Sequence, residues 1–191
     1  ATFRAVMIIS DAEFYNSGSM TTAQVQTFLN QRAPNCVPAG NGVPCLKNFR
    51  QSTPNRDATP RCKAYSGAAN ETAAAIIRKV GAACGINPKV LLELLQKEQS
   101  LVTSSGNALT PRKYQIATGF GRTGTAACDE QYYGFFTQLY NASAQFKRYA
   151  QNPYGYAHVA GRTHAVRLPP HAPCRRASVR PQHHATARSY P

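Results

Sequence analysis

The chain has 191 residues, enough for one sizeable hydrophobic core, and 42% of them are hydrophobic. No segment approaches 18 consecutive apolar positions, so composition indicates a soluble globular protein and excludes a membrane span. Lys and Arg number 22 against 8 Asp and Glu, a formal charge of +14 that would draw the protein to a polyanion such as nucleic acid or the anionic bacterial wall. Much of this excess falls after residue 157, so it is partly a property of the C-terminal tail.

The six cysteines indicate export. They are widely and irregularly spaced, without the Cys-x-x-Cys pair of a zinc or redox site. The start "ATFRAVMIIS" lacks the features of a signal peptide, which leaves a cytosolic protein or a cleaved mature form, and a disulfide framework favours the second. Fifteen pairings are possible, and proximity favours Cys36 with Cys45 and Cys62 with Cys84, leaving Cys128 with Cys174.

The first 69 residues predict one helix between less regular segments. Residues 5–10, "AVMIIS", are strand-like, and residues 11–20 are rich in turn formers, among them Asp11. Thr21 and Gln24 have the spacing of a capping box, which predicts a helix running to about residue 31. Residues 33–69 hold prolines, glycines and three cysteines without a sustained period, and predict a long loop held by disulfides.

Three further helices follow. Asn70 is placed to cap the second, with Glu71 complementing its dipole, and Gly85 is placed to end it. Asn87 and Pro88 open the third as cap and first-turn residue. Residues 103–128 are turn-rich with a strand-like piece, "YQIATGF", and Asp129 is placed to cap a long fourth helix over residues 130–151.

The predicted fold is therefore mainly α (α+β), stapled by disulfides, with a small loop or β element between the third and fourth helices. Regular signals fade near Pro153, so we expect one domain over residues 1–157 and a basic Pro/Arg/His-rich tail over residues 158–191.

Glu98 interrupts the apolar stripe of the third helix, seven residues after Leu91 and four after Leu94. Glu93 lies on the opposite face and has a lysine four residues to either side, as in an ion-paired surface glutamate. The Glu98 side chain either is exposed to solvent at a frayed helix end or lines a cleft. In a cleft, an apolar setting would raise the pKa of a carboxyl and suit it to general acid catalysis.

Other chemistry has weaker signals. Asp129 has a sufficient explanation as a helix cap, with a catalytic role as the alternative. All five histidines fall in the tail without helical two-histidine spacing, so we expect no metal site and no nucleophilic triad. "GFGRTG" lacks the preceding strand and following helix of a dinucleotide loop, and no cofactor is expected.

The motifs around Glu98 resemble a known family. A helix ending in "KEQS", a loop, "YQIATGFG" and an aromatic helix are similar in order to the catalytic core of the lysozyme superfamily, as in goose-type lysozymes and lytic transglycosylases. Longer stretches, among them "VLLELLQKEQSLVT" and "CDEQYYGFF", resemble a group of secreted actinobacterial proteins labelled uncharacterised or haemagglutinin-like. That group carries a cysteine where this chain has Arg122, which implies that Cys128 has a different partner here.

The resemblance implies a lysozyme-like helical core in a secreted, monomeric muramidase that cleaves β-1,4 bonds of bacterial peptidoglycan. Glu98 would be the general acid, with Asp129 as the second carboxylate, or with assistance from the substrate's acetamido group or a positioned water. The implied sugar-binding residues are Gln99, Ser100, Thr103, Tyr114, Gln115, Tyr132 and Tyr133. The alternatives are a non-catalytic wall- or glycan-binding protein and, last, a nucleic-acid binder, which rests on charge alone.

Overall fold

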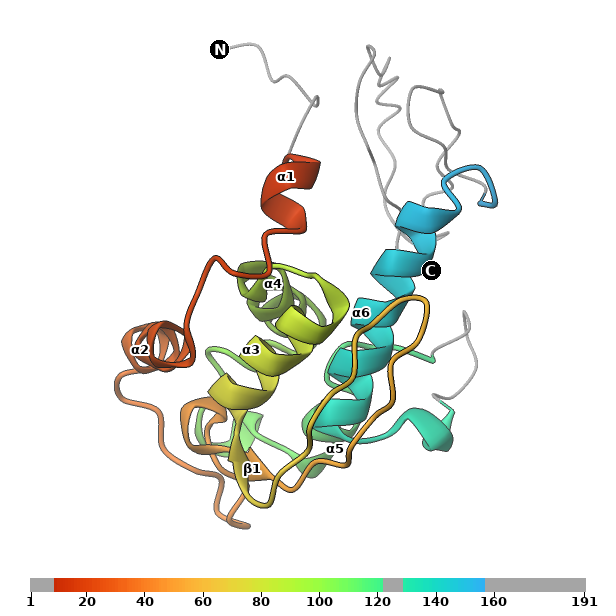
Figure 1. The fold of residues 1–191 in the computed structure, drawn as a ribbon. Coiled ribbons are helices and arrows are strands. Elements are labelled where there is room, and N and C mark those ends of the chain that lie inside the picture. Colours follow the sequence, from red (N-terminus) through yellow and green to blue (C-terminus); the bar gives the residue numbers. More distant parts are fainter. Residues whose placement is uncertain (1–8, 122–128, 157–191) are drawn as a thin grey trace, which may run out of the picture.

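The computed structural model describes residues 9–121 and 129–156 and is mainly helical (Figure 1). Its α-helices are α1 (Asp11–Phe14), α2 (Thr22–Arg32), α3 (Ala73–Cys84), α4 (Pro88–Gln99), α5 (Pro111–Gln115) and α6 (Phe135–Gln151). Three 3-10 turns, η1 (Leu46–Asn48), η2 (Gly106–Ala108) and η3 (Glu130–Tyr132), and two short strands, β1 (Arg50–Gln51) and β2 (Glu71–Thr72), complete the fold. The predicted fold class, mainly helical with a small β element and disulfide staples, is confirmed.

Helix α3 is the centre of the core, and α2, α4 and α6 all pack against it. Its apolar face is completely buried, with Ile76, Ile77 and Val80 at 0% exposure. Burying each of these side chains stabilises the fold by about 1.5–3 kcal/mol. The arrangement holds α4 and α6, which carry the candidate site, against one rigid helix.

Three helix boundaries agree with the sequence signals. Thr21 and Gln24 form the predicted capping box, in which Gln24 N–H donates to Thr21 Oγ1 at 3.2 Å and Thr21 N–H donates to Gln24 Oε1 at 2.8 Å. Gly85 ends α3 in the left-handed conformation, with φ of 64°. Asn87 caps α4, because its Oδ1 accepts from Lys89 N–H at 2.9 Å.

Two predicted helix starts are wrong. Helix α3 is capped by Thr72, whose Oγ1 accepts from Ala75 N–H at 3.1 Å, while Asn70 turns the chain with φ of 54°. Asp129 caps only η3, and the long helix α6 begins after Gly134, whose φ of 107° breaks the helical path.

The segment predicted as a strand and the segment predicted as a turn are both helical in part. Residues 114–120 are not a strand, because Thr110 and Pro111 start helix α5, which contains Tyr114, before a turn. The segment around Asp11 is the one-turn helix α1, capped by Ser10, rather than an irregular turn. Most of the strand-like run at residues 5–10 lies outside the described residues, as does the tail from residue 158.

The predicted loop at residues 33–69 is largely irregular and held by disulfides as expected, but its second part forms a long hairpin. At its base β1 and β2 pair antiparallel, with Arg50 opposite Thr72 and Gln51 opposite Glu71. Farther out, an isolated bridge joins Arg56 and Tyr65. The hairpin (gold in Figure 1) runs alongside α6, where Gln151 Nε2 donates to Pro60 O at 2.8 Å. The β element therefore precedes α3 instead of lying between the third and fourth helices.

Glu71 anchors this hairpin and does not serve the α3 dipole. It is 8% exposed, and its carboxylate accepts from the hydroxyls of Tyr65, at 2.7 Å, and Thr53, and pairs with Lys79. Burial opposes ionisation, but the hydrogen bonds from Lys79, Thr53 and Tyr65 outweigh it and hold the pKa of Glu71 below its usual value.

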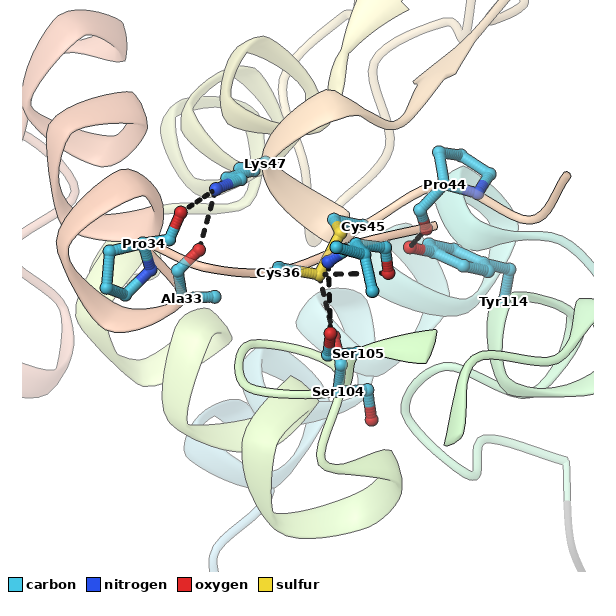
Figure 2. The surroundings of a disulfide bond; sticks show 10 residues. Ala33, Pro34, Cys36, Pro44, Cys45, Lys47, Ser104, Ser105 and Tyr114 are labelled. Atoms are coloured by element: carbon cyan, nitrogen blue, oxygen red, sulfur yellow. Dashed lines mark hydrogen bonds between the residues drawn. A yellow bond between two sulfur atoms is a disulfide. The ribbon is translucent and has the colours of Figure 1, made fainter. Parts of the chain in front are cut away.

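Two disulfides fasten the irregular segments as predicted, Cys36 to Cys45 and Cys62 to Cys84. Figure 2 shows the first, with Lys47 Nζ donating nearby to the carbonyls of Ala33, at 2.7 Å, and Pro34, at 2.8 Å. Cys128 and Cys174 lie outside the described residues, so their pairing stays a prediction. Within residues 9–121 and 129–156, none of the helices combines the length and apolar character of a membrane span.

Candidate active site

Glu98 lies in the last turn of α4, and the helix does not fray before it. Ser100 ends the helix with φ of 54°, and its N–H donates to Gln96 O at 2.9 Å. The stripe of Leu91, Leu94 and Leu95 is buried, and the Glu98 side chain continues it with 30% exposure. The carboxylate is thus half-buried at the rim of the core.

A small cavity of about 70 Å³ opens beside Glu98. Leu94, residues 118–120 and the α6 side chains Ala142, Gln145, Phe146 and Tyr149 form its other walls. Among the described residues that line it, Glu98 is the only acid. The volume corresponds to about two water molecules, so the carboxylate borders a small, mostly apolar space whose lining also includes one amide, Gln145.

Gly119 approaches the carboxylate closely because it has no side chain. Its φ is 69°, and a Cβ there would lie 3.3 Å from Glu98 Oε2. Any other residue would be strained in the left-handed region and would crowd the carboxylate. The backbone of Gly119 therefore lies directly against the carboxylate of Glu98.

The charged neighbours of Glu98 differ from the sequence prediction. Lys97 Nζ lies 3.7 Å from Glu98 Oε1, and Lys89 pairs with Glu13 at 3.2 Å. Neither lysine pairs with Glu93, so the predicted ion pairs of that exposed residue are wrong. The Lys97 pair joins sequence neighbours near solvent, where such a contact is weak.

Gln138 holds the loop that faces Glu98, and sequence reasoning missed it. It is 0% exposed on α6; its Oε1 accepts from the N–H groups of Thr118, at 3.2 Å, and Phe120, at 3.1 Å. Its Nε2 donates to the carbonyls of Phe120, at 3.0 Å, and Tyr132, at 2.7 Å. The available signal was an amide within the apolar face of the fourth helix, the same kind of interruption that drew attention to Glu98.

The other predicted site residues after residue 121 do not line the cavity. Asp129 is exposed and caps η3, with Gln131 N–H donating to its Oδ1 at 3.2 Å. Tyr132 packs edge-on against Phe120, with ring centroids 4.9 Å apart, and so supports a cavity wall. Tyr133 carries the guanidinium of Arg112 over its ring at 4.6 Å.

Tyr114 has a structural position. It is 6% exposed, stacks on Phe49 with ring centroids 4.3 Å apart, and donates its hydroxyl to Pro44 O at 2.7 Å (Figure 2). Burial raises the pKa of its hydroxyl. Gln115 is exposed and accepts from Gly134 N–H through its carbonyl at 2.9 Å.

The remaining predicted site residues, Gln99, Ser100 and Thr103, lie at or after the end of α4, but not all of them are next to Glu98. Gln99 and Ser100 are its last residue and its cap, next to Glu98 in sequence. Thr103 instead accepts from Gln96 Nε2 at 3.0 Å and lines a separate groove together with Glu93. That groove and the Glu98 cavity share no residue, so the structure does not bring Thr103 to the candidate acid.

In the part of the chain that the structure describes, no three His, Cys, Asp or Glu side chains come together as a metal site. All five histidines lie outside it.

Comparison with known proteins adds one finding. The family model described as "LasA, N-terminal domain" matches residues 7–177. No curated protein and no solved structure matches the chain, so the likeness to lysozymes stays a prediction. Because the match spans most of the 191 residues, the protein belongs to the LasA N-terminal domain family.

Proposed function

We propose that the protein is secreted, acts on the bacterial cell wall, and is a glycoside hydrolase of the muramidase type that cleaves β-1,4 bonds of peptidoglycan. The observation that carries the proposal is the half-buried carboxylate of Glu98 facing a small cavity at a helix end. LasA is a secreted staphylolytic peptidase-related protein, which supports a wall-directed role. The two disulfides support export.

Glu98 would protonate the glycosidic oxygen as the bond breaks through an oxocarbenium-like state. A cavity of about 70 Å³ is far below the roughly 300–1,000 Å³ of sites that enclose a ligand, so the sugar would lie across its mouth. The cavity itself would hold water or the leaving oxygen between Glu98 and Gln145.

The absence of a second acid from the described lining favours assistance by the substrate's acetamido group or by a positioned water. Asp129 stays a candidate second carboxylate. An Asp129→Asn variant separates the two possibilities, because it keeps activity if assistance comes from the substrate or water.

The test compares release of reducing ends from peptidoglycan by wild type, Glu98→Gln and the matched surface variant Glu130→Gln. Loss of a general acid lowers the rate by about 10²–10⁴-fold, while Glu130→Gln should retain the wild-type rate because Glu130 is exposed on η3. Thermal unfolding of all three proteins controls for folding. Equal rates for wild type and Glu98→Gln would refute the catalytic role.

The second candidate is a non-catalytic wall- or glycan-binding protein. The small volume beside Glu98 favours it, because a surface that only binds glycan does not need to enclose its ligand. Equal wall binding by wild type and Glu98→Gln, with no release of reducing ends by either, would establish this alternative.

A further inference from the structure

A second concave site lies on the opposite side of α4 from Glu98. It is an open groove of about 530 Å³ between α2 and α4, within the size range of ligand sites. Helix periodicity explains the separation, because Leu92 and Gln96 lie on one side of α4 while Leu94 and Glu98 lie on the other.

The floor of the groove is aliphatic and aromatic. Met20, Phe28, Leu92 and Val102 form it, and its exposed surface is mostly apolar. One polar pair crosses it, in which Gln96 Nε2 donates to Thr103 Oγ1 at 3.0 Å. A side-chain amide and a hydroxyl at this place can exchange hydrogen bonds with the amide groups of a ligand.

The rim carries two opposite charges on facing helices. Arg32 of α2 lies over the Phe28 ring at 5.1 Å, and Glu93 is on α4. Within the described parts of the chain neither forms an ion pair, whereas the third rim charge, Lys89, is paired with Glu13 at 3.2 Å. The groove thus offers one cation and one anion that form no ion pair within the described residues.

We infer that this groove binds a short peptide with small apolar side chains, a free carboxylate and a free amine. Arg32 matches a carboxylate with its paired N–H groups, and Glu93 matches an ammonium group. Methyl groups fit the apolar floor, and peptide amides fit Gln96 and Thr103. A carbohydrate would instead require a more polar lining than Met20, Leu92 and Val102 provide.

The occupant with this chemistry is an alanine-containing peptide released from the bacterial wall polymer, because the amine of its first alanine is bound to the glycan while the polymer is intact. This choice of occupant rests on the proposed cell-wall function. Peptide binding is nevertheless measured without glycan cleavage, so failure of the groove and failure of Glu98 as an acid give different results.

The experiment titrates the full chain with trialanine, which carries a free amine and a free carboxylate, and with N-acetyl-trialanine amide, which carries neither. Binding is followed by calorimetry and by NMR shifts of the Met20 and Val102 methyl groups. Removing one exposed charge contact weakens binding by about threefold to fivefold. We therefore expect that loss for Arg32→Gln and for Glu93→Gln, and a loss of about ninefold to 25-fold for the blocked peptide on wild type, because it lacks both charges.

The matched controls are Arg61→Gln and Asp57→Asn, which change exposed charges on the hairpin, and Glu98→Gln. All three should bind trialanine as wild type does. No saturable binding, equal affinity for the two peptides, or undiminished binding by Arg32→Gln and Glu93→Gln would overturn the inference. Loss of binding in Glu98→Gln would also overturn it, because the ligand would then occupy the other side of α4.

Discussion

Replacing Gln138 with leucine tests whether one buried amide holds the loop beside Glu98. Leucine fills a similar volume but removes the acceptor for Thr118 N–H and the donor for the Tyr132 carbonyl. A buried group left unpaired costs about 1–3 kcal/mol. Thr118 is 7% exposed and cannot easily regain a partner from water, whereas Phe120 and Tyr132 are half-buried and can.

We therefore expect Gln138→Leu to lower the free energy of unfolding by about 1–3 kcal/mol. The measurement is urea unfolding followed by circular dichroism, with the slope against urea unchanged. Gln31→Leu, an exposed change on α2, is the matched control and should stay within about 0.5 kcal/mol of wild type. A loss in Gln138→Leu no larger than in the control would refute the anchoring argument.

Three further predictions concern other parts of the fold. Because hydrogen bonds hold the pKa of Glu71 below its ordinary value of 4.5, the stability they provide is complete above that value and is lost as the pH falls through the lower folded-state pKa. Glu71→Gln should lose about 1.5–3 kcal/mol at pH 7 in urea titrations and flatten the acid dependence; an unchanged pH profile would contradict this. Gly119→Ala should cost about 1–2 kcal/mol for a left-handed residue and also slow peptidoglycan cleavage by crowding Glu98. Stability and activity equal to wild type would refute the close approach seen there. Joint replacement of Cys62 and Cys84 by serine opens a loop with a sequence separation of 22 and should cost about 3 kcal/mol, measured by thermal unfolding without reductant. A melting temperature unchanged from wild type would show that this disulfide does not form.

Local signals predicted those parts of the fold that depend on neighbours in sequence. The Thr21 and Gln24 capping box, the Asn87 cap and the Gly85 terminus each require contacts within about four residues, and all three were confirmed. Both described disulfides followed from proximity along the chain. The position of Glu98 in the final turn followed from helical periodicity.

The errors arose where distant residues or a competing local signal decide the outcome. Glu71 seemed to serve a helix dipole, but Thr53, 18 residues away, and Tyr65 draw it into the hairpin. Tyr114 seemed to lie in a strand, although Thr110 followed by Pro111 is itself a helix start.

Of the candidate site, the acid could be predicted but the loop that faces it could not, because distant residues position that loop. Periodicity identified Glu98, but the loop that faces it is positioned by Gln138, which is 18 residues from Phe120 and 20 from Thr118. The division between the cavity of Glu98 and the groove of Thr103 depends on how α4 packs against its neighbours. The sequence marks Gln138 as an amide within an apolar helix face, but it does not show which distant loop that amide binds.

The hairpin from β1 to β2 also bears on how well the protein resists proteolysis. Exposed, irregular segments are the usual targets of proteases, and this one is largely solvent-exposed. Its base is paired, its middle is bridged at Arg56 and Tyr65, and near its tip Cys62 is bonded to the end of α3. Reduction of the Cys62–Cys84 disulfide would therefore release the tip of the hairpin and expose it to cleavage.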